Sequence, residues 1–507
     1  MAVRQRIAAV LRGLAVAGLT AVAVLRVRDA LKFLSDGIAV IRYPFGLDYG
    51  EGALLNQVQQ LAAGHSIYHS VDQPPYTVSN YPPVFQLITA LLDACVHDTL
   101  AAGRALSVAS TLLMVVVIGM VVWRALPMDL GLIRRGLAAL IGGLGVLSIW
   151  YTQRWAPLMR IDMLAGLFAW IGVLLFVAGA GQRRYWCAVP FLLALYTKHT
   201  ALAAPAACLI VALVVDRRYA VRLAAIILGT GLGLFLAIDA LTAGTFHFLL
   251  IKANNNAFSW AQAFSYLLDI KANYPVELAI AVVGAVSLLR QHVTGNSNVS
   301  RRAANWNWAR PVLGVFLFTA FLVSLTVGKI GAYVNYLIEF TGVMWACVAV
   351  MVGDACAEAE RTQAIVPRVV AALLPVLLLV PMSSGAASPD RLVVPDTRQR
   401  DAMQELLEMV RRTDGPVLSQ DMTLLVLAGK PVEFQPVDMT NLANQREWDE
   451  NGIVRPIEQR RYRLVILDFD VAAPPDSVYL SPRIVGAIRD QYRLLARMAS
   501  YWVYAPA

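Results

Sequence analysis

The segment "RYPFGLDYGEG" (Arg42–Gly52) follows the first long apolar stretch of the chain and carries two carboxylates, Asp48 and Glu51. The stretch before it is long enough to cross a lipid bilayer, which takes about 20 apolar residues. Charged side chains are costly beside a membrane, so those present there are candidates for function. The segment therefore marks both the end of a membrane-embedded helix and the start of a candidate functional loop.

The composition of the whole chain is typical of a membrane protein. Of the 507 residues, 58% are hydrophobic and only 15% are charged, whereas about 25% are charged in an ordinary soluble domain. The formal net charge is +9, but most lysines and arginines lie in short loops between apolar runs, where membrane topology accounts for them. The sequence has no basic stripe interleaved with aromatic residues, which excludes nucleic acid as a partner. The expected fold is mainly α, a polytopic bundle of transmembrane helices.

Eleven apolar runs are candidates for crossing the membrane. They lie near residues 8–26, 104–123, 136–152, 162–180, 186–197, 199–215, 222–241, 275–289, 311–328, 332–353 and 367–383. The first run has the basic and apolar parts of a signal peptide, but similar runs follow along the chain, so we interpret it as a retained span. Whether residues 27–41 form a separate amphipathic helix at the interface is left open.

Arginine-rich loops give the orientation of these spans. Basic pairs lie in alternate loops, at Arg134 and Arg135, Arg183 and Arg184, and Arg217 and Arg218. The positive-inside rule places such loops in the cytoplasm. Residues 43–102 contain no lysine or arginine, so residues 42–103 are expected to be the first extracytoplasmic loop. The topology closes only if residues 81–96 do not cross, so 51–64 and 81–96 are predicted to be two surface helices.

The sequence changes in character after Pro381. A polar linker rich in Ser and Pro follows, and beyond it helical segments such as "DAMQELLEMVRR" (401–412) alternate with strand-like ones such as "YRLVILDFD" (462–470). We therefore expect a transmembrane core at residues 1–383 and a small soluble α/β domain at 384–507. Because the number of spans is odd, the second domain is expected outside, beside the acidic loop.

Polar side chains at the extracytoplasmic ends of the spans are the candidates for chemistry. They are Asp48 and Glu51 in the first loop and, after later spans, Arg160, Asp162, Lys198, His199, Lys329, Asn335, Tyr336 and Glu339. A carboxylate can accept a proton from an attacking hydroxyl or amine, and Lys or Arg can stabilise a departing phosphate. An outward-facing site lacks easy access to cytosolic nucleotide donors. A sugar carried on a membrane lipid phosphate solves that supply problem.

Structural roles compete for the same residues. Asp48 suits the N-cap of the helix that follows it. Arg160 and Asp162 could form a purely structural pair, and Lys198 could extend toward the membrane interface. Glu339, inside an apolar run, could pair with a cation from a neighbouring helix. Each residue alone is a weak signal, and the common side of the membrane makes the set more informative.

Five segments together carry a family resemblance. They are "LDYGEG" (47–52), "YPPVFQLITALL" (81–92, leading to "AAGRALSV"), "MRIDMLAGLFAW" (159–170), "LALYTKHTALAAPA" (193–206) and "GKIGAYVNYLIEF" (328–340). In their order and their side of the membrane, these segments resemble the GT-C superfamily of integral-membrane glycosyltransferases. The nearest branch holds protein O-mannosyltransferases and lipid A aminoarabinose transferases. The resemblance implies a GT-C helix bundle.

The resemblance also implies a reaction. These enzymes move a sugar from a polyprenyl-phosphate donor to an acceptor, usually with inversion at the anomeric carbon. By resemblance, Asp48 is the general base, and Glu51 orients the acceptor or Asp48. The residues expected to bind substrate are Tyr81, Arg160, Asp162, Lys198, His199, Lys329, Asn335, Tyr336 and Glu339. Lys198, with Arg160 as a second candidate, is assigned to the donor phosphate. Tyr336 and Glu339 are assigned to the sugar or lipid head.

The implied partners are a polyprenyl-phosphate sugar donor, a glycan, lipid or protein acceptor, and membrane lipids. The reaction requires no cofactor. The spaced acids Asp48 and Glu51 permit a divalent metal, Mg²⁺ or Mn²⁺, without requiring one, and the five cysteines share no metal-ligand spacing. Tyr81 stands where some relatives have an acid, Lys or His before the Pro-Pro motif. The high content of Ala, Val and Arg favours a bacterial inner membrane.

Two other classes of function are open. A transporter or lipid flippase without transferase activity would use the intramembrane charges as a translocation path. The polar groups, however, gather near one face, and the sequence lacks paired halves with matching interrupted helices. An envelope scaffold would leave the clustered acids and cations unexplained. Glycosyl transfer is therefore the expected function, with the flippase as its main alternative.

Overall fold

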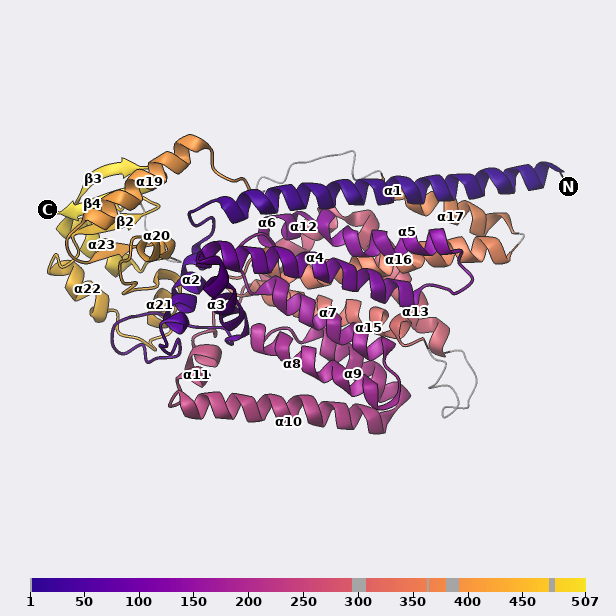
Figure 1. The fold of residues 1–507 in the computed structure, drawn as a ribbon, viewed down its shortest axis with the longest axis horizontal. Helices are drawn as coiled ribbons and strands as arrows, with labels where there is room; N and C mark the ends of the chain where they lie inside the picture. Colours follow the sequence, from indigo (N-terminus) through magenta and orange to yellow (C-terminus); the bar gives the residue numbers. More distant parts are fainter. Residues whose placement is uncertain (1, 294–306, 363, 380–391, 474–478) are drawn as a thin grey trace.

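The structure is a computed structural model that describes residues 2–293, 307–362, 364–379, 392–473 and 479–507. Helices make up most of it, and many of them lie along the long axis of the molecule in Figure 1. The C-terminal segment (residues 392–507), with its small sheet, lies at one end. The boundary expected between residues 383 and 384 falls outside the described residues.

In the described residues before 380, the secondary-structure elements are all helices or helical turns. They are α1 (Ala2–Arg42), α2 (Tyr49–Ala62), α3 (Val84–Val96), α4 (Thr99–Ala125), α5 (Leu132–Leu144), η1 (Gly145–Ser148), α6 (Trp150–Trp155), α7 (Asp162–Ala178), η2 (Gly181–Cys187), α8 (Ala188–Thr197), α9 (Ala203–Val215), α10 (Arg217–Leu241), α11 (Thr245–His247), η3 (Phe248–Lys252), α12 (Trp260–Asn273), α13 (Pro275–Val293), α15 (Ala309–Ser324), η4 (Leu325–Gly328), η5 (Val334–Leu337), α16 (Ile338–Arg361) and α17 (Ile365–Leu377). The η elements are short 3-10 turns, except η3, which is a π-helical turn.

Within the described residues, five helices are long and apolar enough to cross a membrane, at Gln5–Arg42, Thr99–Ala125, Arg217–Leu241, Ala309–Gly328 and Val334–Arg361. A sixth arises if α12 and α13, which meet at an angle of 98°, count as one span. Each of the eleven expected runs contains all or part of a helix. The shorter apolar helices, such as α9 with 13 residues, reach only about 20 Å, less than the ~30 Å of hydrocarbon. The chain is an integral membrane protein with five or six candidate spans by length.

The first helix is longer than the sequence indicates. α1 is one continuous helix of 41 residues, so residues 27–41 do not form a separate interfacial helix. In Figure 1 its N-terminal end extends past the other helices, while its other end leads into the first loop. α16 lies within the bundle, where Trp345 and most of its neighbours are buried. These two helices anchor the loops that carry the candidate site.

The C-terminal segment combines a small mixed sheet with short helices. Its elements are α19 (Thr397–Arg412), β1 (Val417–Ser419), α20 (Met422–Leu427), α21 (Pro436–Asn444), α22 (Asn451–Glu458), β2 (Leu464–Leu467), α23 (Pro482–Gln491), β3 (Tyr492–Met498) and β4 (Tyr501–Pro506). The strand order is β1-β2-β4-β3, with β1 parallel to β2 and β4 antiparallel to both its neighbours. All four residues of β2 are buried, as in a central strand covered on both faces. The expected α/β character is confirmed.

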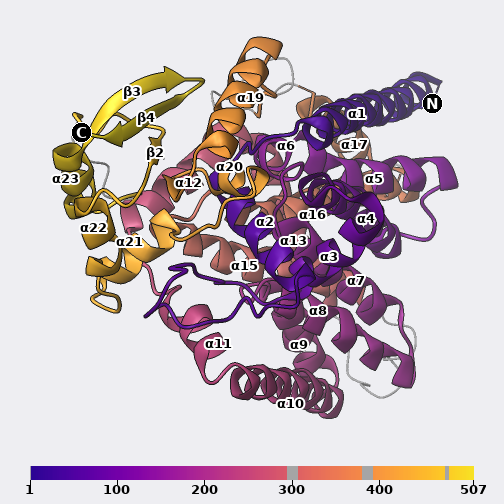
Figure 2. The ribbon, with the colours of Figure 1, turned by 60° about the vertical axis from the view of Figure 1, so that its left-hand side comes forward.

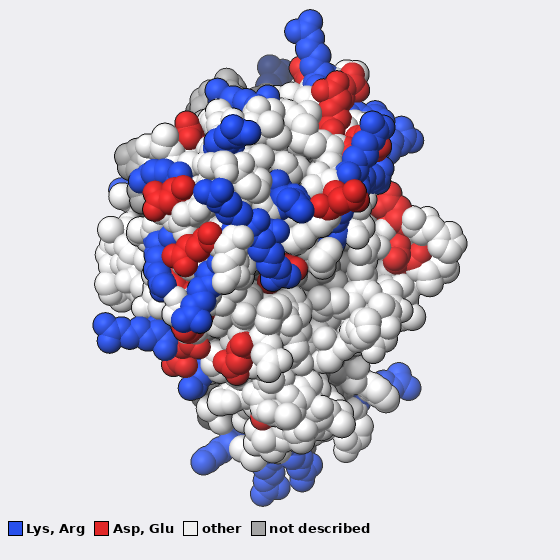
Figure 3. All heavy atoms as spheres, turned by 90° about the vertical axis from the view of Figure 1, so that its left-hand side faces the viewer, with Lys and Arg blue, Asp and Glu red and all other residues white. Residues whose placement is uncertain are grey.

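Charge is unevenly distributed over the end of the molecule that carries the C-terminal segment. Figure 3 shows acidic and basic side chains over the upper part of this face and a mostly uncharged lower part. In Figure 1, α10 lies along the lower edge. Its apolar side chains, among them Leu228 and Leu241, are exposed, as expected for a helix that faces lipid.

The first loop and the C-terminal segment are joined by backbone pairing. Tyr76 pairs with Phe434 in parallel. The Tyr76 N–H donates to the Glu433 carbonyl at 2.8 Å, and the Gln435 N–H donates to the Tyr76 carbonyl at 2.9 Å. The Val78 N–H then donates to Gln435 Oε1 at 2.9 Å, across 357 positions of sequence. The C-terminal segment is therefore docked directly on the loop that holds Asp48, and Figure 2 shows α20 beside α2. From α21, the Val437 N–H donates to the Tyr49 hydroxyl at 3.0 Å.

Two glycines of the opening segment allow this close approach. A Cβ atom on Gly50 would lie 1.8 Å from Arg160 Nη1, and a Cβ atom on Gly52 would lie 2.6 Å from the backbone nitrogen of Thr423 in α20. Real Cβ atoms do not approach other heavy atoms so closely. Because glycine has no Cβ atom, Arg160 and the C-terminal segment can pack directly against α2 at these two positions.

The Gly52→Ala variant is expected to loosen the docking of the C-terminal segment, because a backbone atom of α20 must give way. Overpacking of this kind costs about 1–3 kcal/mol. Limited proteolysis of the purified protein should release the C-terminal segment faster than in the wild type. Gly136→Ala in α5 is the matched control, since a Cβ atom there meets nothing within 4 Å. Equal protease resistance of the two variants would contradict this account of Gly52.

Candidate active site

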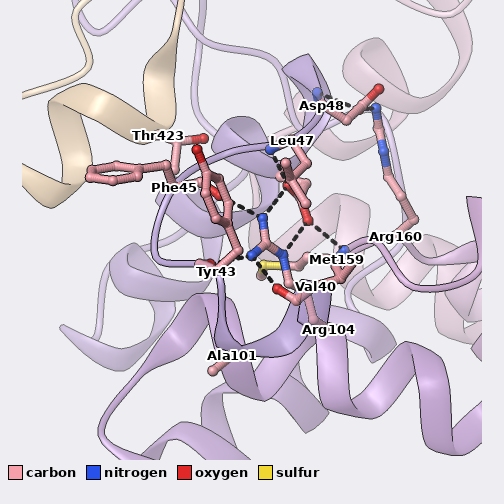
Figure 4. Close-up of polar contacts among 12 residues, drawn as sticks. Val40, Tyr43, Phe45, Leu47, Asp48, Ala101, Arg104, Met159, Arg160 and Thr423 are labelled. Carbon is pink, nitrogen blue, oxygen red and sulfur yellow. Dashed lines mark hydrogen bonds and ion pairs between the residues drawn. The ribbon is translucent and has the colours of Figure 1, made fainter. Parts of the chain in front are cut away.

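Arg104 of α4 holds the first loop in place (Figure 4). Its Nε lies 2.8 Å from Oε1 of Glu51, and its Nη2 lies 2.7 Å from Oε2. Its other N–H groups donate to the carbonyl oxygens of Val40, Tyr43 and Phe45 at 2.8, 2.6 and 2.7 Å. Both side chains of the ion pair are 0% exposed. The five donors of the guanidinium fork thus each meet an acceptor.

Glu51 is occupied by protein groups on both oxygens. Besides Arg104, Oε2 accepts the Leu47 N–H and Oε1 accepts the Met159 N–H, each at 2.8 Å. A carboxylate enclosed in this way has no direction left for a substrate, so the expected contact between Glu51 and the acceptor does not fit its position. Glu51 instead ties the first loop to the segment that precedes α7.

Asp48 has two partners. Its Oδ1 accepts the Gly50 N–H at 2.9 Å and so caps α2. Its carboxylate also forms an ion pair with Arg160, and the two side chains keep 17% and 15% of their surface exposed. The structural interpretation of Asp48 is therefore confirmed, because it caps a helix, and its ion pair links it to Arg160, which lines the second cavity described below.

A second ion pair joins Asp162 and Lys198. Lys198 Nζ lies 2.7 Å from Asp162 Oδ1, and Asn335 donates to the same oxygen at 2.9 Å. The ammonium of Lys198 also lies 4.4 Å from the ring centroid of Tyr336, a cation–π distance. Asp162 thus pairs with Lys198 rather than with Arg160, the structural partner considered from the sequence.

Trp155 connects the two ion pairs. Its Nε1–H donates to Asp162 Oδ2 at 2.7 Å. The guanidinium carbon of Arg160 lies 4.6 Å from its ring centroid, which is a second cation–π contact. Because both ion pairs contact the same rigid indole ring, a displacement of one pair would shift the position of the other.

Two cavities adjoin these pairs and share Asn335 and Tyr336. The first cavity, of about 50 Å³, is lined by Asp162, Lys198, Asn335, Tyr336 and Glu339 and by apolar side chains of α4 and α7. The second cavity, of about 150 Å³, lies between α2, the loop before α16 and α21, and its lining includes Tyr81, Arg160 and Lys329. The structure thus gathers residues from widely separated segments of sequence around two adjoining spaces.

The remaining candidates differ in their surroundings. Glu339 Oε1 is buried without a hydrogen-bond partner among the described residues. Lys329 Nζ donates to the Asn254 carbonyl at 3.0 Å. His199 follows Lys198 in the chain but is not among the residues that line either cavity. Glu339 is therefore well placed for a ligand of the first cavity, whereas nothing in this arrangement assigns a task to His199.

The carboxylates of the site do not gather as metal ligands. Within the described residues, no three His, Cys, Asp or Glu side chains lie close enough together to hold a metal ion. Asp48 and Asp162 are each paired with a cation instead. The residues present therefore do not fit a divalent metal.

Two residues of this arrangement escape the sequence analysis. Arg104 lies in an apolar run, and an arginine at membrane depth was a usable signal. Asp438 comes from α21 and lines the second cavity. Burial raises the pKa of its carboxyl to about 6, although Gln435 and Arg160 act in the opposite direction. Asp438 lies outside the apolar runs and in no recognisable motif, so the sequence offers no signal for it like the one at Arg104.

Solved structures resemble this chain over nearly its whole length. ArnT from Cupriavidus metallidurans in the apo state gives a TM-score of 0.56 at 14% identity, covering 96% of this chain and 98% of that chain. The chain has the fold of ArnT. ArnT bound to undecaprenyl phosphate gives a TM-score of 0.54 at 13% identity, covering 94% of this chain and 97% of that chain.

An archaeal protein has the ArnT-like fold as well. The oligosaccharyltransferase AglB from Archaeoglobus fulgidus, in complex with an inhibitory peptide and a dolichol-phosphate, gives a TM-score of 0.51 at 12% identity. It covers 97% of this chain and 74% of that chain. These likenesses show that the chain shares its fold with ArnT and with this oligosaccharyltransferase, as the resemblance of the five segments implies. Comparison with protein-family models and with curated proteins finds no match.

Proposed function

We propose that this protein is a glycosyltransferase that moves a sugar from a polyprenyl-phosphate donor to an acceptor. The observation that carries the proposal is the pair of ion pairs, Asp48–Arg160 and Asp162–Lys198, joined by Trp155 between two adjoining cavities. The ArnT fold supports it, because solved proteins with this fold bind undecaprenyl phosphate or a dolichol-phosphate.

Lys198 is the residue that we assign to the donor phosphate. An ammonium has three donors, and one of them is directed to Asp162. The others are available to hold the phosphate as charge develops on the leaving oxygen. Glu339 and Tyr336 line the same cavity and are assigned to the sugar or lipid head. A space of about 50 Å³ holds only a few water molecules, so donor binding requires the side chains around Lys198 to move.

Asp48 is the residue that we assign as general base. The acceptor hydroxyl or amine attacks the anomeric carbon, the bond from that carbon to the phosphate oxygen breaks, and the lipid phosphate leaves with the bonding electrons. The acceptor proton passes to Asp48, which Arg160 keeps charged and oriented. Because the cap and the ion pair both use Oδ1, Oδ2 is the oxygen assigned to the proton. Attack opposite the leaving group inverts the anomeric configuration.

Glu51 and Arg104 act as positioning residues in this proposal. Their buried network fixes the loop on which Asp48 lies, so of the two roles expected for Glu51, to orient the acceptor or Asp48, the proposal keeps the second. No step is routed through a metal, because the two carboxylates that could bind one are already paired with cations. The task of the protein is to position reactants and to place charge where it develops.

The proposed setting is the outer face of a bacterial inner membrane. All eleven apolar runs are proposed to cross or enter the bilayer, the shorter helices within a locally thinner region. The first loop and the C-terminal segment then lie outside, as the arginine-rich loops on the other side favour. Sugars on lipid phosphates reach this face without cytosolic nucleotides.

Replacing Lys198 by methionine is expected to lower donor consumption by about 100-fold to 1,000-fold, because the departing phosphate loses a preorganised cation. Membranes that contain the protein would be incubated with radiolabelled polyprenyl-phosphate sugars, and the loss of labelled donor would be followed. Lys271→Met in α12 is the matched control, since Lys271 is exposed and lies outside both cavities.

The same assay separates the transferase from a flippase. If wild-type membranes leave every labelled donor intact but carry it across the bilayer, the protein is a lipid transporter and the transferase proposal is wrong. Donor consumption that Lys198→Met leaves unchanged would remove Lys198 from the proposal.

A further inference from the structure

The second cavity is built by three parts of the chain that are far apart in sequence. α2 and the first loop provide one wall, the loop before α16 provides another, and α21 of the C-terminal segment closes it. Its volume of about 150 Å³ is of the order of a cavity that encloses one six-membered ring. Since it shares Asn335 and Tyr336 with the first cavity, a ligand in it lies beside the donor site.

The lining of this cavity has an unusual chemistry. Amide side chains dominate its polar part: Gln57, Asn80, Asn254, Asn256, Gln435 and Asn441. Every amide offers both donors and an acceptor. Asn256 Oδ1 is buried and has no partner among the described residues, so an acceptor there is open. Tyr49, Tyr81 and Trp155 add flat aromatic faces.

Asp438 is the carboxylate of this cavity. Its Oδ1 accepts from Asn80 at 3.3 Å, and its Oδ2 accepts from Gln435. Gln435 is itself fixed, because its Oε1 accepts the Val78 N–H. The nearby cation, Arg160, is paired with Asp48. The carboxylate is therefore held in one orientation and keeps lone pairs for a further donor.

These features favour a polyol over other ligands. A sugar ring presents hydroxyl groups that both donate and accept, and its C–H faces pack on aromatic rings. A lipid tail requires a mainly apolar lining, whereas amide, phenolic and charged side chains make up much of this one. An anionic group would meet Asp438 as well as the cations Arg160 and Lys329, and these cations already contact Asp48 and the Asn254 carbonyl. A peptide in extended form exceeds the space of one ring. The hydrogen-bonding pattern of the lining thus matches a monosaccharide unit.

We infer that the second cavity is the acceptor subsite, that it takes a sugar unit of a glycan acceptor, and that α21 supplies Asp438 and Asn441 to bind its hydroxyl groups. This inference rests on the proposed transferase function and names the class of its acceptor. It gives the C-terminal segment a direct part in substrate binding, beyond covering the site. Arg160, the ion-pair partner of Asp48, lines this cavity, so the cavity brings the bound hydroxyl to the ion pair that is to take its proton.

Direct binding tests the inference without any donor. The full-length protein in lipid nanodiscs would be mixed with methyl glycosides of common hexoses and pentoses, and saturation-transfer NMR would report bound sugars. At least one glycoside is expected to bind the wild type, with binding at least tenfold weaker in Asp438→Asn, because a charge-assisted hydrogen bond is lost. Asp490→Asn is the matched control, an exposed acid on α23 that leaves binding unchanged.

Asn441→Ala is a second variant, in case the buried Asp438→Asn protein folds poorly. It removes an amide from the same face of α21 and is also expected to weaken glycoside binding. Binding of inorganic phosphate or of a short Ser/Thr peptide in place of every glycoside would overturn the sugar assignment. If both variants bind glycosides as tightly as the wild type does, the sugar binds elsewhere, and the assignment of the second cavity as the acceptor subsite is wrong. Donor consumption is measured separately, so a failed transferase proposal is distinguishable from a failed acceptor subsite.

The pH dependence provides an independent readout. Because burial raises the pKa of Asp438 to about 6, its charged form is lost as the pH falls through that value. Glycoside binding is therefore expected to strengthen as the pH rises from 5 to 7 in the wild type and to stay flat in Asp438→Asn. The other charged or titratable groups around the cavity are Arg160, Lys329, Tyr49, Tyr81, Tyr333 and Tyr336, and none of these types ordinarily titrates in that range. A flat wild-type profile would contradict a role for the charged carboxylate.

Discussion

Replacing Asp48 by asparagine is expected to slow sugar transfer by about 100-fold to 10,000-fold, the range for loss of a general base. The amide cannot accept the acceptor proton, but asparagine is as good an N-cap as aspartate, so α2 keeps its start. The donor site around Lys198 is unchanged. Transfer would be measured with the donor found for the wild type, and donor binding would be measured separately by displacement of labelled undecaprenyl phosphate.

Asp98→Asn is a close control for that variant. Asp98 caps α4 through the Ala101 N–H at 3.0 Å, just as Asp48 caps α2, but it is exposed, whereas Asp48 pairs with Arg160, a residue that lines the second cavity. Asp98→Asn should leave the transfer rate within about twofold of the wild type, since exposed substitutions of this kind change little. A loss of donor binding in Asp48→Asn, rather than of turnover, would mean that Asp48 only holds the loop.

Replacing Arg104 by methionine is expected to destabilise the protein more than any other single change considered. It would leave Glu51 charged and 0% exposed, and removing one partner of a buried pair costs about 3–5 kcal/mol. The carbonyl groups of Val40, Tyr43 and Phe45 would lose their donors as well. Thermal unfolding in detergent would show a markedly lower midpoint.

Two further variants sharpen this test. Arg361→Met breaks an exposed pair with Asp129 and should shift the midpoint far less, because such pairs are largely screened by solvent. The double variant Arg104→Met with Glu51→Leu removes both charges. It should still melt below the wild type, because five backbone groups lose their partners. If the double variant is as stable as the wild type, the hydrogen bonds to the backbone add nothing to stability, and the network acts only as an ion pair.

Periodicity and charge placement explain how much of this fold can be predicted. The apolar runs locate helices, and the lack of basic residues after Arg42 marks the acidic loop. The segments around Asp48, Asp162 and Lys198 indicate the candidate site, because charges beside apolar runs are rare. The order of these segments and the residue types in them do not depend on distant contacts, so one sequence is enough to identify them.

The sequence alone does not show which distant segments of the chain contact one another. From spacing alone, Arg160 and Asp162 look like partners, but they lie two residues apart and their side chains diverge to Asp48 and Lys198. Glu51 looks catalytic because it lies near Asp48, yet the chain turns it inward to Arg104. Asp438 offers no local signal at all, since its environment exists only once α21 meets the first loop. Span length is a similar case, because neighbouring helices decide how a short helix sits in the bilayer.

The pairing of Tyr76 with Phe434 determines how late during synthesis the first loop can complete its contacts. The Val78–Gln435 hydrogen bond links positions 357 residues apart, and ribosomes add about 5–20 residues per second. The first loop would therefore remain without its partner for roughly 20 to 70 seconds, with Asp48 on an incomplete surface. Any factor that escorts this protein during synthesis should be needed in that interval, and a chain that ends before residue 434 would carry the ion pairs but lack one wall of its acceptor subsite.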